Sequence, residues 1–160
     1  MRRIVALVAT SVVVIAQTAS GAGQSPEAKR LVGAWRLVGY QFDSDQVDPN
    51  RGGHPVGLLQ YDTNGSMGVQ IMPDRPRAKY ATTLPTGEEA RSAMLGYTAY
   101  FGTYTVDERA HTVTHHREGS INPGDVGREL VRRYEFQSPD RMALIPLDGL
   151  PRTLTWERIR

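Results

Sequence analysis

The sequence predicts an all-β domain: eight antiparallel strands that form an up-and-down barrel, with one helix between the third and fourth strands. Short runs rich in β-branched and aromatic residues alternate with polar residues, as strands with one buried face do. Turn-forming residues separate most of these runs by only a few positions, so consecutive strands should pair in order. Closing such a meander into a barrel removes its unpaired edges, and a two-sheet sandwich is the alternative.

The individual elements follow from this pattern. In chain order, the strands are predicted at Leu31–Phe42, Pro55–Tyr61, Ser66–Met72, Tyr100–Val106, His111–Glu118, Arg128–Gln137, Met142–Leu147 and Arg152–Ile159. Thr86, followed three residues later by Glu89, is typical of a capping box at a helix N-terminus. Apolar residues then recur at helical spacing, which predicts a helix from about Gly87 to Thr98.

Residues 1–22 are predicted to be a secretory signal peptide, which leaves residues 23–160 as the barrel domain. Arg2 and Arg3 precede an apolar run, Ile4–Ala16, and small residues follow it. A spanning helix needs about 20 apolar residues, so this run is too short to be a stable membrane anchor. We therefore expect export to the periplasm or out of the cell.

Composition narrows the possible functions. A length of 160 residues suits one domain with a single core. The chain contains no cysteine, which excludes disulfides, zinc–thiolate sites and cysteine nucleophiles. The 19 Lys and Arg residues exceed the 17 Asp and Glu residues only through the two arginines of the expected leader. The mature domain would be formally neutral, so we expect no nucleic-acid partner.

Turn lengths predict which side chains face the barrel interior, because cross-strand partners share a face. A turn at Asp62–Gly65 would pair Tyr61 with Ser66. The interior then receives Val56, Leu58, Met67, Val69 and Ile71. The turn at Ser138–Arg141 leads to a second interior set. It consists of Arg132, Tyr134, Phe136, Ala143, Ile145, Leu147, Leu154, Trp156 and Arg158.

The hairpin at Tyr100–Ser120 contains three of the chain's four histidines. Pairing Val106 with His111 across its turn divides its side chains between two faces. The inward face receives Tyr100, Gly102, Tyr104, Val106, Val113, His115 and Arg117. The outward face receives Phe101, Thr103, Thr105, Thr112, Thr114 and His116.

His115 and Arg132 are the unusual members of this otherwise apolar interior. A buried charge needs a partner or a wet cavity, because burying it alone is costly. A ligand cavity would meet that need. We therefore expect ligand contacts from Tyr100, Tyr104, His115, Arg132 and Tyr134.

No metal and no other cofactor is expected from the histidines. Adjacent residues of a strand point to opposite faces, so His115 and His116 cannot easily chelate one ion. His111 and His115 could share a face, but four residues of extended strand separate them by roughly 13 Å. We interpret these histidines as structural or ligand-contacting groups.

A Gly-x-Trp motif, Gly33 to Trp35, opens the first predicted strand, and Arg158 lies on the last one. Further characteristic segments are Leu31–Trp35, Pro55–Leu59, Tyr100–Tyr104, Val113–Ser120 and Trp156–Arg158. In these segments the chain resembles the bacterial and fungal lipocalin-like domain family, whose barrels are related to the calycins. The resemblance implies a central cavity for a small hydrophobic molecule. It also implies that Arg158 packs over Trp35, beside Gly33, and closes the barrel floor.

The resemblance favours an exported protein that binds a small hydrophobic molecule in the barrel cavity. One alternative is a cofactor-free isomerase or cyclase acting on a small hydrophobic metabolite. In that enzyme His115 would transfer protons and Arg132 would hold an enolate or carboxylate. A second alternative is a structural or interaction module of the cell envelope, which a filled barrel core would favour.

Overall fold

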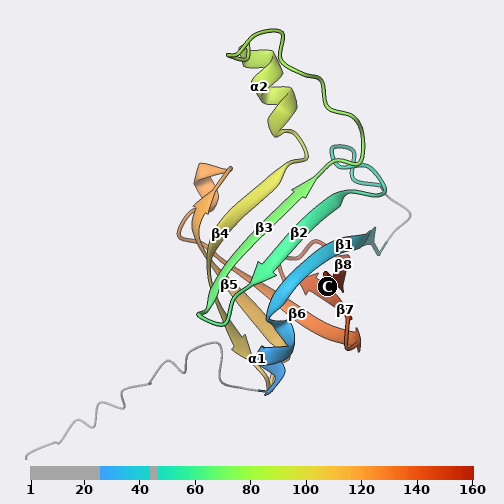
Figure 1. The fold of residues 1–160 in the computed structure, drawn as a ribbon, viewed down its shortest axis with the longest axis vertical. Coiled ribbons are helices and arrows are strands. Elements are labelled where there is room, and N and C mark those ends of the chain that lie inside the picture. The colour runs from blue at the N-terminus through green and yellow to red at the C-terminus, as the bar shows by residue number, and fades with distance from the viewer. Residues whose placement is uncertain (1–25, 44–46) are drawn as a thin grey trace, which may run out of the picture.

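The structure is a computed structural model that describes residues 26–43 and 47–160. The predicted signal peptide, residues 1–22, lies outside the described residues. Eight antiparallel strands form one closed barrel in the order β1 to β8, and β8 pairs with β1 (Figure 1). The predicted barrel is therefore confirmed, and the two-sheet sandwich is excluded.

The strands agree closely with their predicted ranges. They are β1 Gly33–Phe42, β2 Val56–Tyr61, β3 Ser66–Met72, β4 Thr98–Asp107, β5 Thr112–Ser120, β6 Glu129–Ser138, β7 Arg141–Pro146 and β8 Arg152–Arg158. Successive strands run in opposite directions, so alternate connections lie at the same end of the barrel. Three connections, β1–β2, β5–β6 and β7–β8, therefore share one end with the long β3–β4 connection. A short 3-10 helix, η1 Pro123–Asp125, lies within the β5–β6 connection.

The helix α2, Gly87–Met94, occurs between β3 and β4 as predicted. Its capping box is present, because the Thr86 hydroxyl accepts from the Glu89 amide and the Glu89 carboxylate accepts from the Thr86 amide. The helix ends earlier than predicted, since Gly96 takes a left-handed φ of 76° and β4 begins shortly after it. α2 projects away from the barrel and buries none of its own residues (Figure 1). We call the end from which it projects the α2 end.

The helix α1, Pro26–Leu31, covers the opposite end of the barrel, which we call the α1 end (Figure 1). The sequence does not predict this helix, because it has only 6 residues and a largely polar composition. Tertiary contacts hold it in place: Leu31 is 0% exposed, and its carbonyl accepts a hydrogen bond from Trp35 Nε1 at 2.8 Å. Within the described part of the chain, no helix has the length and apolar character needed to cross a membrane.

The predicted orientation of β2 is wrong, whereas that of β3 is right. Tyr61 pairs with Met67, and the Asp62 amide donates to the Ser66 carbonyl at 2.9 Å. The register is therefore shifted by one residue from the expected pairing, with Gly65 in the left-handed region at a φ of 87°. A one-residue change of register reverses a strand's faces. The buried residues of β2 are Leu59 and Tyr61, and Val56 and Leu58 point outward.

The orientation of β7 also differs from the prediction. An irregularity in the β6–β7 pairing lies between Phe136 and Ser138, and Phe136 pairs with Met142. Met142 and Leu144 consequently share the inward face with Tyr134. The residues predicted to lie there, Ala143, Ile145 and Leu147, lie on the other face, and Leu147 is 56% exposed.

The faces of the β4–β5 hairpin are as predicted. Val106 pairs with Val113 instead of His111, so the turn is longer than expected. His111 closes this turn with a left-handed φ of 51°. Because the register differs by two residues, every side chain keeps its predicted face. His115 is buried inside the barrel, and His116 lies on the outer wall, where it contacts Thr105 and Glu129.

Candidate functional site

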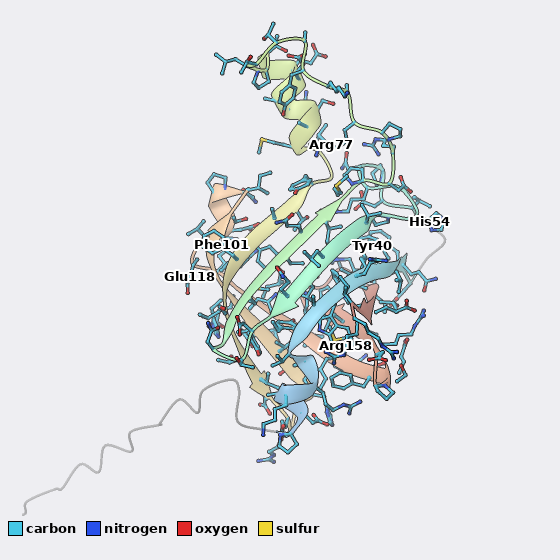
Figure 2. All side chains as sticks on the ribbon, viewed as in Figure 1. Tyr40, His54, Arg77, Phe101, Glu118 and Arg158 are labelled. Carbon is cyan, nitrogen blue, oxygen red and sulfur yellow. The ribbon has the colours of Figure 1, made fainter. Side chains whose placement is uncertain are left out.

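The α1 end of the barrel is sealed by the residues of the Gly-x-Trp motif and Arg158. The Arg158 guanidinium carbon lies 4.1 Å from the centre of the Trp35 ring. Two of its nitrogens donate to the carbonyls of Val32 and Arg30, each at 2.7 Å (Figure 2). Gly33 leaves room for this arginine, since a Cβ there would lie 2.6 Å from Arg158 Nη1. The arginine therefore holds α1, β1 and β8 together over the barrel floor.

A polar cluster lies inside the barrel around His115, which is 0% exposed. The hydroxyl of Tyr61 lies 2.5 Å from His115 Nε2, and that of Tyr100 lies 2.9 Å from His115 Nδ1. Arg132 Nη1 lies 3.2 Å from the same Nδ1. We call Tyr61, Tyr100, His115 and Arg132 the interior cluster. Its members come from β2, β4, β5 and β6, so the barrel must close before the cluster can form.

The arginine determines which nitrogen of His115 carries the proton. A guanidinium can only donate, so His115 Nδ1 must accept. In a neutral imidazole the proton then lies on Nε2, which donates to the Tyr61 oxygen. Burial, aided by the Arg132 charge, holds the pKa of His115 well below its usual range, which keeps the ring neutral at physiological pH. Both nitrogens of His115 are therefore engaged.

The two tyrosines of the interior cluster are neutral phenols. Burial raises the pKa of Tyr61 well above its usual value, although the Arg132 charge opposes this effect. Burial likewise raises the pKa of Tyr100, and the charges of Arg132, Arg117 and Arg152 oppose it. With His115 also neutral, Arg132 carries the only formal charge in the cluster.

Three arginines towards the α2 end have an aspartate partner. Arg51 contacts Asp48 at 2.7 Å, and Arg152 contacts Asp148 at 2.6 Å. Arg117, which stacks on the Tyr100 ring, contacts Asp125 at 3.2 Å. Arg132 is 7% exposed and has no carboxylate within 4.0 Å among residues 26–43 and 47–160.

Two residues predicted to contact a ligand lie elsewhere. The Tyr104 hydroxyl donates to the Asp62 carbonyl at 2.9 Å. The Tyr134 hydroxyl donates to Glu27 of α1 at 2.5 Å, and burial together with Glu27 raises the pKa of Tyr134. Both tyrosines thus stabilise the α1 end. Of the five predicted contacts, the structure brings together only Tyr100, His115 and Arg132.

Sequence reasoning missed two interior residues with functional potential. The sequence pattern predicts the wrong face for Tyr61, and only the correct register of the β2–β3 hairpin would indicate its position. The pattern predicts the inward face for Trp156 but gives no role to its indole N–H. That N–H is buried and has no hydrogen-bond partner among the described residues. The interior therefore contains donors that no protein acceptor satisfies.

The outer wall of the barrel is hollowed over four of its strands. A hollow of about 440 Å³ lies over β2 to β5, and its lining includes Leu58, Gln70 and Phe101. Phe101 is 61% exposed and covers Gly119, where a Cβ would lie 2.3 Å from the ring (Figure 2). In the described residues, no group of three or more His, Cys, Asp or Glu side chains is arranged to hold a metal ion.

Comparisons with known proteins identify the family to which the chain belongs. Among solved structures, the chain is similar to a redesigned β-barrel at 12% sequence identity and a TM-score of 0.45. The match covers 82% of this chain and 94% of the redesigned one. A search of curated proteins found no match. The model of the lipocalin-like domain family matches residues 32–159, nearly the whole of the barrel described above. The chain therefore belongs to the lipocalin-like domain family.

Proposed function

We propose that the protein binds one small hydrophobic molecule inside its barrel, with access from the α2 end. The observation that carries this proposal is the surplus of donors on the inward face. The buried Trp156 N–H has no acceptor among the described residues, and Arg132 has no carboxylate within 4.0 Å in the same part of the chain. Buried donors of this kind are costly unless something accepts from them. A bound molecule with an acceptor group would remove that cost.

The two ends of the barrel support access from the α2 side. At the α1 end, Leu31 and Trp35 are fully buried beneath α1 and Arg158. Partly buried apolar side chains pack against the core towards both ends, Tyr40 and Leu130 towards the α2 end and Val106 and Phe136 towards the α1 end. α2 projects away from the barrel and provides no helical cover at its own end (Figure 1). An apolar lining with a few converging polar groups is typical of a ligand pocket.

The geometry favours binding over the cofactor-free isomerase. A general base needs a lone pair within reach of the substrate proton. His115 Nδ1 already accepts from Arg132 and Tyr100, and Nε2 donates to Tyr61. His115 is therefore better placed to orient Arg132 and the tyrosines than to abstract a proton. Turnover that depended on His115 would reverse this preference.

Uptake of an uncharged fluorescent hydrophobe tests the proposal. N-phenyl-1-naphthylamine should bind the purified protein and increase in fluorescence, and native mass spectrometry of protein from its own host should detect a bound small molecule. Leu130→Trp, which fills the interior next to His115, should abolish uptake. Phe101→Ser, on the outer wall, is the matched control and should leave uptake unchanged. Loss of uptake in Phe101→Ser alone would place the site on the outer wall instead.

We also propose that the protein is exported, on the basis of residues 1–22. Three features support cleavage near Ala22: the arginines Arg2 and Arg3, the apolar run after them, and the small residues that follow this run. Expression of the full chain with cell fractionation and N-terminal sequencing tests this. A mature N-terminus near Gly23 is expected in the exported fraction. An intact N-terminus in the cytoplasm would contradict export.

A further inference from the structure

The outer surface of β2, β3 and β4, which we call the uncharged wall, lacks ionisable groups. From Val56 on β2 to Thr105 on β4, no outward-facing side chain of these three strands is ionisable. The outward side of β6 to β8 is different, because arginine–glutamate pairs such as Arg141 with Glu157 lie there. Charged residues are depleted at the centre of protein interfaces, so the uncharged wall has the composition of a surface that meets another protein.

The uncharged wall carries an aromatic knob beside an open hole. Phe101 stands out from β4 with 61% of its surface exposed, and its ring covers Gly119 of β5 (Figure 2). Its cross-strand neighbour on the other side is Gly68 of β3, where an added Cβ would meet no atom within 4 Å. The space over Gly68 belongs to the hollow of about 440 Å³ described above.

A knob and a hole side by side are complementary to the same wall of a second copy of the chain. The hollow extends from β2 to β5, so its centre lies between β3 and β4. A two-fold axis through this centre, parallel to the strands, places each Phe101 over the Gly68 of the other copy. Such a contact uses the same patch on both copies, as two-fold dimers do. The hollow also reduces the outward curvature of the wall, which would otherwise limit contact between two barrels.

The charge distribution fits a second copy as well. A two-fold contact brings like residues close together, so a charge near its centre would face the same charge. The uncharged wall avoids this repulsion. The same axis brings Gln60, at the β2 edge, towards Glu118 at the β5 edge of the other copy (Figure 2). Neither side chain makes a hydrogen bond or ion pair in the described part of the chain, and an amide can donate to a carboxylate.

We propose that the uncharged wall is a dimer interface between two copies of this chain, in which Phe101 of each copy fills the hollow over Gly68 of the other. This inference is independent of ligand binding inside the barrel. Four strands about 4.8 Å apart span roughly 15 Å, so the contact is small for a specific interface. We therefore expect a dissociation constant on the order of micromolar.

Sedimentation velocity of the purified protein tests the proposal. Concentrations from about 1 to 100 µM bracket the expected dissociation constant and should show monomers giving way to dimers. Phe101→Ser should raise this constant by at least about 30-fold, as truncation of a central interface residue does. Gly68→Glu places a charge in the hole and should remain monomeric. Gly87→Glu, the matched control in α2, adds the same side chain at another open position and should dimerise like the wild type.

Two substitutions of Gln60 test the two-fold arrangement. Gln60→Lys should strengthen the dimer through an ion pair with Glu118 of the other copy, and Gln60→Glu should weaken it by repulsion. Each change in the dissociation constant should be about twofold to fivefold. Both changes should disappear when Glu118 is replaced by glutamine. Equal effects of the two substitutions would overturn this arrangement.

Two results would overturn the dimer itself. One is a monomer at every concentration, and the other is a dimer that persists in both Phe101→Ser and Gly68→Glu. If the monomer also lost N-phenyl-1-naphthylamine binding in Phe101→Ser, the uncharged wall would be a small-molecule site instead. Circular dichroism of each variant should match the wild type, because the side chain added at Gly68 enters open space. If Gly68→Glu did not fold, Phe101→Ser, which removes only an exposed ring, would decide the question.

Discussion

The floor of the barrel and its interior use the same kinds of residues in different ways. At the α1 end, an arginine lies over a tryptophan and both of its hydrogen-bonded carbonyls belong to the chain. In the interior, Arg132 has no carboxylate within 4.0 Å among the described residues. At the α1 end the tyrosine hydroxyls bond to Asp62 and Glu27, whereas Tyr61 and Tyr100 surround His115. The hydrogen bonds of the floor are thus made within the chain and contribute stability, whereas the buried Trp156 N–H has no acceptor among the described residues. Proteins commonly leave local interactions unsatisfied where they bind ligands.

The largest expected effect comes from removing the floor tryptophan. Trp35→Ala should lower the free energy of unfolding by about 3–5 kcal/mol, because a fully buried aromatic side chain leaves a cavity. Urea unfolding measures this loss. Tyr40→Ala, towards the α2 end, removes a partly buried ring and should cost about half as much or less. Equal losses at both positions would remove the distinction between a sealed and an open end.

Removing the arginine that covers this tryptophan should have a smaller effect. Arg158→Met deletes the cation–π contact and the hydrogen bonds to Val32 and Arg30, at a cost of about 1–3 kcal/mol. The exposed Arg160 provides the matched control, and Arg160→Met should leave the unfolding midpoint nearly unchanged. Hydrogen exchange should also become faster at the α1 amides in Arg158→Met. Unchanged protection of α1 would show that this arginine does not hold the helix.

The interior cluster should make stability depend on pH between neutral and mildly acidic conditions. The pKa of His115 is lower in the folded protein than in the unfolded chain, so the unfolded chain binds the proton first as pH falls. Stability is therefore complete above the unfolded pKa of about 6.5 and declines below it, by at most about 1.4 kcal/mol per pH unit. His115→Gln should reduce this slope in urea unfolding measured from pH 7.5 to 5. The exposed His54 is the control, and His54→Gln should keep the slope of the wild type.

Arg132→Met should leave the free protein as stable as the wild type or raise its stability by about 1 kcal/mol. Removing a buried charge that lacks an opposite charge eliminates a desolvation cost, and methionine fills much of the same volume. Thermal unfolding without ligand measures the change. A loss comparable to that of Trp35→Ala would mean that Arg132 belongs to the structural framework and not to a site left open for a ligand.

The smallest effect is expected in α2. Thr86→Ala breaks the capping box and should destabilise this helix by about 1 kcal/mol. Because α2 buries none of its residues, the unfolding midpoint of the barrel should not change. Hydrogen exchange should become faster in the amides of α2 alone. A lower midpoint for the whole barrel would show that the helix contributes to the stability of the α2 end.

Much of the architecture could be read from the sequence, but the interior site was only partly predictable. The β4–β5 hairpin placed His115 inside because an error of two residues in the register keeps every face. The prediction for the β2–β3 hairpin failed because its register is shifted by one residue from the expected pairing, which turns Tyr61 into the barrel and Leu58 out of it. The bulge in the β6–β7 pairing had the same consequence for Leu144 and Ile145. The face that a side chain takes changes when the register of its strand shifts by one residue at a turn or bulge. Local sequence patterns do not specify that register.

By itself, the sequence determined the number and order of the strands, the helix α2 and the barrel class. These features depend on local patterns: alternation, turn residues and a capping box. Only the tertiary structure decided that α1 seals the floor, that Tyr61 completes the interior cluster, and that Arg132 lacks a carboxylate among its described neighbours. Each of these depends on contacts between segments far apart in the chain. Such contacts exist only after the barrel has closed, because closure brings β1 against β8 and directs side chains from all strands towards one interior.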